Sequence, residues 1–171
     1  MVGKKVKLRA LELSDIDLLY KWENDVSTWH LSNTLTPFSK YILEEFISNS
    51  NLDIYTTKQL RLMIEIISSK KAIGCIDLFD FDPFNNRAGI GILICNQERN
   101  KGYATEALEL LIHYCFNTLL LKQVYCNIIC DNTKSLSLFK KFNFEIIGIK
   151  KKWIRKRDFW IDEYMLQLIQ D

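Results

Sequence analysis

The segment from residue 87 to residue 130 constrains the fold most strongly, because a strand, a helix and a second strand follow one another in it. Arg87 to Cys95 is apolar and contains two glycines, which is typical of a buried strand with a close backbone approach. From Ala104 to Phe116 apolar residues recur at helical spacing, and strand character returns from Val124 to Cys130. Parallel strands require such a crossover, so the sequence predicts a parallel pair here.

The rest of the chain carries antiparallel strand patterns. Leu60 to Ile66 alternates apolar and polar residues, and the turn formers from Ser68 to Lys71 lead into a second run, which predicts a hairpin. The turn-forming segment from Asp80 to Asn86 then leads into the third strand of a meander. The expected strands are Lys5–Ala10, Leu60–Ile66, Ala72–Asp80, Arg87–Cys95, Val124–Cys130, Phe144–Lys150 and Phe159–Ile169.

Three further segments predict helices. Ser14 to Asp17 is typical of a helix cap, and an apolar face follows it. Ser39 is expected to cap a second helix after a proline break. Asn132 to Lys141 is expected to form a short helix that buries Leu138 and Phe142. The apolar faces of the first two helices are Leu18, Leu19 and Trp22, and Ile42, Leu43, Phe46 and Ile47.

The length, hydrophobic content and net charge of the chain indicate what class of protein it is. The chain has 171 residues, of which 48% are hydrophobic, so residues 1–171 are expected to form one domain around one core. Its 23 basic and 21 acidic residues give a net charge of +2, which predicts neither a nucleic-acid partner nor a membrane-surface protein. No apolar run resembles an export signal or a membrane span, so we expect a cytoplasmic protein.

Cysteine and histidine usage favours neither disulfides nor a metal site. The five cysteines are odd in number, lack zinc-site spacing and lie in apolar segments, which predicts buried thiols in a reducing compartment. The two histidines, His30 and His113, are too few for a histidine cluster, so no metal is expected. The cysteines are Cys75, Cys95, Cys115, Cys126 and Cys130.

The turn from Gln97 to Ala104 lies between an apolar strand and an amphipathic helix, where a loop can bind phosphate. Backbone N–H groups at a helix start have no intrahelical acceptor and face the positive end of the helix dipole, so they can hold a pyrophosphate. Gly102 leaves room for close approach, and Arg99 and Lys101 add positive charge. The longer glycine patterns of P-loops and dinucleotide sites are missing, and an ordinary strand-to-helix turn is the alternative.

Two segments together resemble one family. Arg99 to Ala104 resembles the Gln/Arg-x-x-Gly-x-Gly/Ala signature with which GNAT acetyltransferases hold the coenzyme A pyrophosphate. Asp131 to Ser135, followed by Leu138 to Phe144, is similar to the family's second signature, Asn-x-x-Ser with an aromatic residue and Gly-Phe after it. The resemblance runs from about residue 5 to residue 168 and is strongest for the RimJ/RimL-like and the diamine or spermidine acetyltransferase branch.

The resemblance implies a fold and an activity. The GNAT fold is an α/β (α+β) architecture with a mixed, mostly antiparallel central sheet of about six to seven strands and about four flanking helices. Its fourth and fifth strands splay apart around the pantetheine, and a backbone N–H near Leu93 is expected to hold the thioester oxygen. The implied enzyme is an acyl-CoA-dependent N-acetyltransferase, in which an amine attacks the thioester of the co-substrate acetyl-CoA directly. The implied coenzyme A residues are Ile92, Leu93, Ile94, Arg99, Asn100, Lys101, Gly102, Tyr103, Ala104, Asn132, Ser135, Phe139 and Lys141.

Two catalytic groups that are usual in the family are missing from this chain. Relatives commonly have Tyr at the position of Phe139, as the acid for the leaving thiolate, and Glu at the position of Gly89, as the base. Asp77 and Asp80 match acidic positions of the polyamine branch and are candidates to accept the amine proton through water, with strand-end solvation as the alternative. Water or Tyr125 is expected to protonate the thiolate.

The acceptor is the least constrained part of the prediction. The first helices of the family wall the acceptor site, although core packing also accounts for the tryptophans that fall there. The residues at these positions are Trp22, Glu23, Asn24, Asp25, Trp29 and His30. We expect a small amine such as a polyamine or an amino sugar. A non-catalytic coenzyme A binder and an enzyme acting on the N-terminal amine of a ribosomal protein are the alternatives.

The segment from Lys150 to Arg157 is the sharpest basic cluster in the sequence. Its aromatic residue would suit RNA, but the balanced total charge favours a solvated hairpin. We therefore expect a small-molecule partner and neither a nucleic-acid nor a membrane partner. A homodimer is left open.

Overall fold

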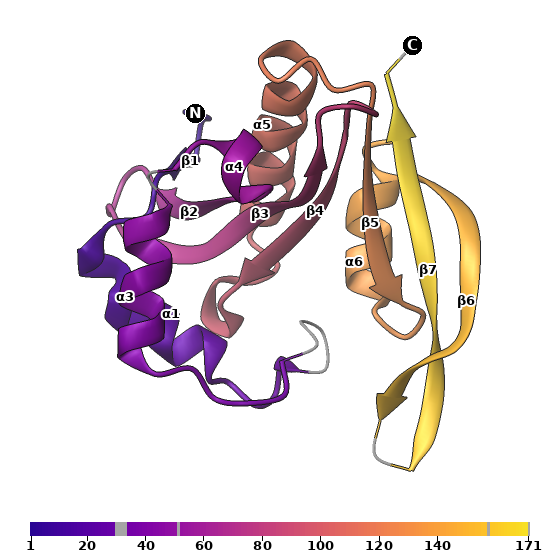
Figure 1. Cartoon of the computed structure of the whole chain (residues 1–171), viewed down its shortest axis with the longest axis horizontal. Helices are drawn as coiled ribbons and strands as arrows, with labels where there is room; N and C mark the ends of the chain where they lie inside the picture. Colours follow the sequence, from indigo (N-terminus) through magenta and orange to yellow (C-terminus); the bar gives the residue numbers. More distant parts are fainter. Residues whose placement is uncertain (30–33, 51, 157, 171) are drawn as a thin grey trace.

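The computed structural model describes residues 1–29, 34–50, 52–156 and 158–170. The strands of this part of the chain are β1 (Val6–Arg9), β2 (Leu60–Ile66), β3 (Ala72–Asp82), β4 (Arg87–Ile94), β5 (Gln123–Ile129), β6 (Glu145–Lys156) and β7 (Phe159–Ile169). They form one seven-stranded sheet in the order β1-β2-β3-β4-β5-β7-β6 (Figure 1). The helices are α1 (Ile16–Glu23), α3 (Lys40–Asn49), α4 (Ile54–Thr57), α5 (Tyr103–Asn117) and α6 (Thr133–Lys140), with 3-10 turns η1 (Leu13–Asp15) and η2 (Asn96–Glu98).

The predicted mixed, mostly antiparallel sheet is confirmed, with every expected strand present. β3 and β6 run further than predicted, to Asp82 and Lys156. The sequence did not predict α4, because a helix of four residues is too short to show a periodic pattern. Its start is fixed instead by Asp53, whose carboxylate accepts a bond from the Thr56 N–H at 3.0 Å. In the part of the chain described here, no helix has the length and apolar character needed to cross a membrane.

β4 and β5 are parallel, as predicted, but they pair over a short stretch only. The paired residues run from Arg87 opposite Gln123 to Gly89 opposite Tyr125. Beyond that point β4 stays on β3, and β5 stays on β7 along its whole length. The sheet therefore opens into two halves between β4 and β5 (Figure 1), and the predicted splay of these strands is confirmed.

Each face of the sheet contributes to its own core. Ile64 and Ile76 belong to the larger cluster, which includes residues of α5 such as Leu108. The neighbouring positions Met63 and Cys75 belong to the second cluster, which includes residues of α1 and α3. Because successive side chains of a strand point to opposite faces, helices cover both faces of the sheet. The site lies in the sheet, between the helices that cover its two faces, at the point where β4 separates from β5.

Two helix predictions are confirmed, and one needs correction. The Ser39 hydroxyl accepts a bond from the Ile42 N–H at 3.2 Å, so Ser39 caps α3 as predicted. The cap residue of α1 is Asp15, which lies within the predicted segment from Ser14 to Asp17, and Ser14 itself belongs to turn η1. α6 buries Phe139, which is 2% exposed, and not chiefly Leu138 or Phe142. The helix ends at Lys140, so Phe142 lies beyond it and is only partly buried.

An arginine between two carboxylates ties the first strand to the first helical turn. Arg9 Nη1 lies 2.7 Å from an Asp15 carboxylate oxygen, and Arg9 Nε lies 2.6 Å from Glu65. Both carboxylates are buried, and burying either charge without a cationic partner would destabilise the fold. This cluster lies away from the opening between β4 and β5, so its role is structural.

We predict that a methyl group at Gly74 disturbs the β3–β4 pair. Gly74 lies opposite Ile94, and a Cβ there would fall well inside contact distance of the Leu93 carbonyl oxygen. Gly74→Ala should lower the free energy of unfolding by about 1–3 kcal/mol, measured by urea denaturation. Gly148→Ala is the matched control, because a Cβ at Gly148 meets nothing within 4 Å, and its effect should stay below about 0.5 kcal/mol. Equal effects of the two substitutions would contradict the prediction.

Candidate active site

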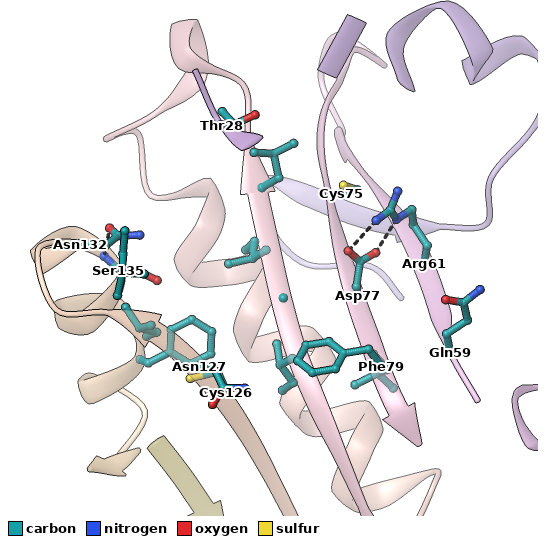
Figure 2. A pocket seen from close by; sticks show the side chains of 18 of the residues that line it. Thr28, Gln59, Arg61, Cys75, Asp77, Phe79, Cys126, Asn127, Asn132 and Ser135 are labelled. Carbon is teal, nitrogen blue, oxygen red and sulfur yellow. Dashed lines mark hydrogen bonds and ion pairs between the residues drawn. The ribbon is translucent and has the colours of Figure 1, made fainter. Parts of the chain in front are cut away.

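A cavity of about 600 Å³ lies at the opening between the two halves of the sheet. Figure 2 shows Arg61 and Asp77 on one side of β4, and Cys126, Asn127 and Ser135 on the other. The lining therefore comes from both halves of the sheet and from α6. Cavities of this size accommodate small-molecule ligands.

A cluster of three charged side chains occupies the β2–β3 side of the cavity. Arg61 binds both carboxylate oxygens of Asp77, with Nε at 2.7 Å and Nη2 at 3.0 Å. Its Nη1 contacts one oxygen of Glu23, which lies at the end of α1. The guanidinium also stacks over the Phe46 ring at 5.3 Å. Burial raises the pKa of the neighbouring Cys75 thiol, so this cysteine stays protonated.

The backbone of β4 presents hydrogen-bonding groups to the opening. The Cys95 N–H donates to the Ile73 carbonyl at 2.8 Å, so this pair is hydrogen-bonded across β3 and β4. Bonded pairs alternate along an antiparallel ladder, which directs the backbone groups of Leu93 toward β3. The residues on either side, Ile92 and Ile94, direct their backbone N–H groups away from β3, into the opening between β4 and β5. The backbone N–H that was expected near Leu93 can therefore come from Ile92 or Ile94, but not from Leu93 itself.

The turn before α5 has the geometry that the sequence predicted for phosphate binding. Gly102 is the N-cap residue with φ 85°, and Asn100 is also left-handed with φ 63°. Among the described residues no side chain caps α5, so the first N–H groups of the helix remain available. Arg99 Nε braces the turn by donating to the Ile94 carbonyl at 2.9 Å. Lys101 forms an ion pair with Glu98 at 2.7 Å.

The remaining coenzyme A candidates divide between the cavity and its surroundings. Asn132 caps α6, and its side-chain oxygen accepts a bond from the Ser135 N–H at 3.2 Å. Both residues line the cavity, as does Phe139, whose ring packs edge-on against Phe144. Lys141 is exposed just beyond α6. Outside the cavity lining, Tyr103 and Ala104 pack against the larger core.

The structure brings Asp80 and Tyr125 together, but not to the cavity lining. The Tyr125 hydroxyl donates to an Asp80 carboxylate oxygen at 3.1 Å, and Tyr125 lies opposite Gly89, where β4 and β5 still pair. Burial, followed by the bond to Asp80, raises the pKa of Tyr125 to about 12. The Phe79 ring covers Gly89, so the space for an acidic side chain at this position is filled. Of the two acidic candidates, Asp77 alone lines the cavity.

The predicted acceptor residues are only partly brought together. Trp22 and Glu23 line the cavity, whereas the Trp29 indole N–H donates to the Glu23 carbonyl at 2.8 Å and holds the loop after α1. His30 lies outside the described residues. Arg61 is not among the predicted site residues, because in the sequence it is one polar residue of an alternating strand, with no motif around it.

Three lysines of the basic segment in β6 form ion pairs with acidic neighbours. Lys151 pairs with Asp162 at 2.8 Å, and Lys156 pairs with Asp131 at 2.8 Å. Lys150 contacts Glu163 at 2.8 Å and lies over the Trp153 ring. These ion pairs reduce the positive charge that the segment presents to a phosphate backbone.

Comparison with known proteins identifies the family. A family model described as "Acetyltransferase (GNAT) domain" matches residues 5–145. An uncharacterized N-acetyltransferase of Bacillus licheniformis, p20, is 27% identical over 168 residues, which cover 98% of this chain and 94% of that protein. The spermidine N(1)-acetyltransferase of Escherichia coli K12 is 27% identical over 150 residues, which cover 84% of this chain and 74% of that protein.

Solved structures agree on the fold. The spermidine N-acetyltransferase from Vibrio cholerae, solved in complex with CoA and spermine, superposes with a TM-score of 0.88 at 21% identity, covering 98% of this chain and 97% of that chain. A dodecameric structure of the Vibrio cholerae enzyme gives a TM-score of 0.82 at 23% identity, with 98% and 95% covered. The chain therefore belongs to the GNAT acetyltransferase family and is an acyl-CoA-dependent N-acetyltransferase.

Proposed function

We propose that the acceptor is a small primary amine, of the polyamine or amino-sugar class, which attacks the acetyl-CoA thioester directly. The observation that carries this proposal is the anionic cavity beside the free edge of β4. Its described lining holds three carboxylates, Glu23, Asp77 and Glu163, against two cations, Arg61 and Lys150. An excess of negative charge attracts an ammonium group. The relatives from Escherichia coli and Vibrio cholerae, which are named as spermidine acetyltransferases, support the same class.

Acetyl-CoA is proposed to lie along the opening between β4 and β5. Its pyrophosphate would bind the N–H groups of the turn from Arg99 to Ala104, which no side chain of the described residues caps. Its pantetheine would follow Ile92 to Ile94, where the N–H groups of Ile92 and Ile94 are directed away from β3, into the opening that β5 leaves. α6 with its cap would form the opposite wall through Asn132, Ser135 and Phe139, and Lys141 would lie just beyond the end of the helix.

The proposed chemistry uses the free edge of β4 and the carboxylates. The amine nitrogen attacks the thioester carbonyl carbon, and a backbone N–H of Ile92 or Ile94 stabilises the oxyanion that forms. When the intermediate collapses, the carbon–sulfur bond breaks and the thiolate leaves. The amine proton passes through water to Asp77, the proposed base. Asp80 and Tyr125 remain the alternative proton-transfer pair, bonded to each other outside the lining.

A panel of acceptors tests the proposed class. Because the cavity is small and anionic, acetyl-CoA turnover should be at least about tenfold faster in kcat/KM with small primary amines than with a ribosomal N-terminal peptide. Free thiol release with spermidine, glucosamine, simple monoamines and the peptide measures this directly. Turnover of the peptide with none of the small amines would contradict the proposal, and acetyl-CoA binding without any turnover would support the non-catalytic alternative.

We predict that Gly102→Glu weakens acetyl-CoA binding at least about tenfold, because a carboxylate would face the pyrophosphate at the helix start. The position also has φ 85°, which disfavours any side chain. Isothermal titration calorimetry gives the affinity. Gly148→Glu adds the same charge in β6 and should leave the affinity unchanged. An unaltered affinity in folded Gly102→Glu would remove the turn from the site.

We predict that Phe139→Tyr raises kcat by less than about tenfold. A thiol has a pKa near 8.5, so thiolate departure at neutral pH is only mildly uphill, whereas an amine of pKa near 10.4 is almost wholly protonated and its deprotonation limits the step. Pre-steady-state and steady-state rates with the best acceptor measure the effect. Phe142→Tyr, outside the cavity lining, is the control. A gain of about 10³-fold would instead mark the natural protein as lacking an essential acid.

A further inference from the structure

The charges of the cavity are arranged unevenly. Arg61 satisfies both carboxylate oxygens of Asp77 but contacts one oxygen of Glu23. Arg61, Asp77 and Glu23 together carry one net negative charge. Since the second carboxylate oxygen of Glu23 is the one that Arg61 does not contact, the uncompensated charge lies there. At the other end of the cavity, Lys150 and Glu163 neutralise each other at 2.8 Å.

We propose that Arg61 determines acceptor specificity by limiting the cavity to one uncompensated negative charge, so that it selects amines with a single positive charge. This inference rests on the proposed function and narrows it from small amines in general to monocationic ones, such as amino sugars and amino alcohols. A second ammonium group on the acceptor finds no uncompensated carboxylate among the described lining residues.

Burial makes this charge balance effective. The side chains of Arg61 and Asp77 are each 23% exposed, and that of Glu23 is 15% exposed, so water screens them incompletely. Arg61 also holds a fixed position, because its planar guanidinium is bound in a bidentate manner to Asp77 and stacked on Phe46. It therefore positions Glu23 as well as neutralising Asp77.

The neutral part of the lining agrees with a single charge on the acceptor. Figure 2 shows Gln59 beside the Arg61–Asp77 pair, with Thr28 and Asn127 elsewhere around the cavity. Amide and hydroxyl groups hydrogen-bond to neutral hydroxyls without adding charge. An acceptor with one ammonium group and hydroxyl groups on its remainder matches this lining.

The test compares two acceptors of equal length, 4-amino-1-butanol and 1,4-diaminobutane, which differ by one positive charge. The natural enzyme should have the higher kcat/KM for the amino alcohol. Arg61→Met removes the cation and leaves two negative charges on Glu23 and Asp77. The ratio of kcat/KM for the diamine to that for the amino alcohol should then rise at least about tenfold. The KM for acetyl-CoA should stay within about twofold, since Arg61 lies outside the proposed coenzyme A residues.

Two further variants separate this role from a structural one. Arg61→Gln also removes the charge but retains hydrogen-bonding capacity toward Asp77, so it should show the same rise if Arg61→Met folds poorly. Arg9→Met is the matched control, because Arg9 likewise bridges two buried carboxylates but lies outside the cavity. It should lower the unfolding temperature and leave the acceptor ratio unchanged.

Calorimetric affinities of both amines for the coenzyme A-saturated protein make the test independent of turnover. If no amine is acetylated but the ratio of affinities still shifts in the Arg61 variants, the proposed function fails and the role of Arg61 stands. If amines are acetylated and neither ratio shifts in the two folded Arg61 variants, the role of Arg61 is overturned and the proposed function stands. The role of Arg61 is also overturned if the natural enzyme prefers the diamine or binds neither amine.

Discussion

The short parallel contact between β4 and β5 is the constraint on which the site depends. Backbone groups within a sheet need partners, and those of β4 find them on β5 only as far as Gly89. Beyond it, β3 holds β4 and β7 holds β5, so each strand remains fixed while the edge between them is free. A ligand that carries amide groups can complete such an edge in the way that another strand would. The sheet thus has an unpaired strand edge in its middle, between two strands that are each held by a neighbour on the other side.

The connection between the two strands places the turn that is proposed to bind the pyrophosphate at the end of this edge. The chain leaves β4 at Ile94, passes through η2 and enters α5 at Tyr103. Arg99 returns a bond to the last carbonyl of β4, and two left-handed residues, Asn100 and Gly102, turn the backbone into the helix. One continuous segment therefore supplies both the strand edge and the uncapped helix start. This explains why the segment was also the most informative part of the sequence.

Periodicity predicted the strands and the longer helices well, because burial on one face is a local property of the pattern. Which residues of different strands and helices meet in space is not a local property. Arg61 and Asp77 face each other across β2 and β3, and Glu23 reaches the same guanidinium from the end of α1. No spacing in the sequence marks this cluster. In the same way, the register of β5 places Tyr125 beside Asp80 and away from the cavity lining. The burial of Phe139 depends on where α6 begins and ends, and a short pattern leaves each end uncertain by about one or two residues.

The proposed coenzyme A site combines the free edge of β4 with the turn before α5. Amide chemical shifts recorded during a titration with coenzyme A distinguish these parts, since each backbone N–H reports separately. We expect the largest changes at Ile92, Ile94 and the residues from Gly102 to Ala104. Changes confined to the basic segment from Lys150 to Lys156, with none along β4, would contradict it.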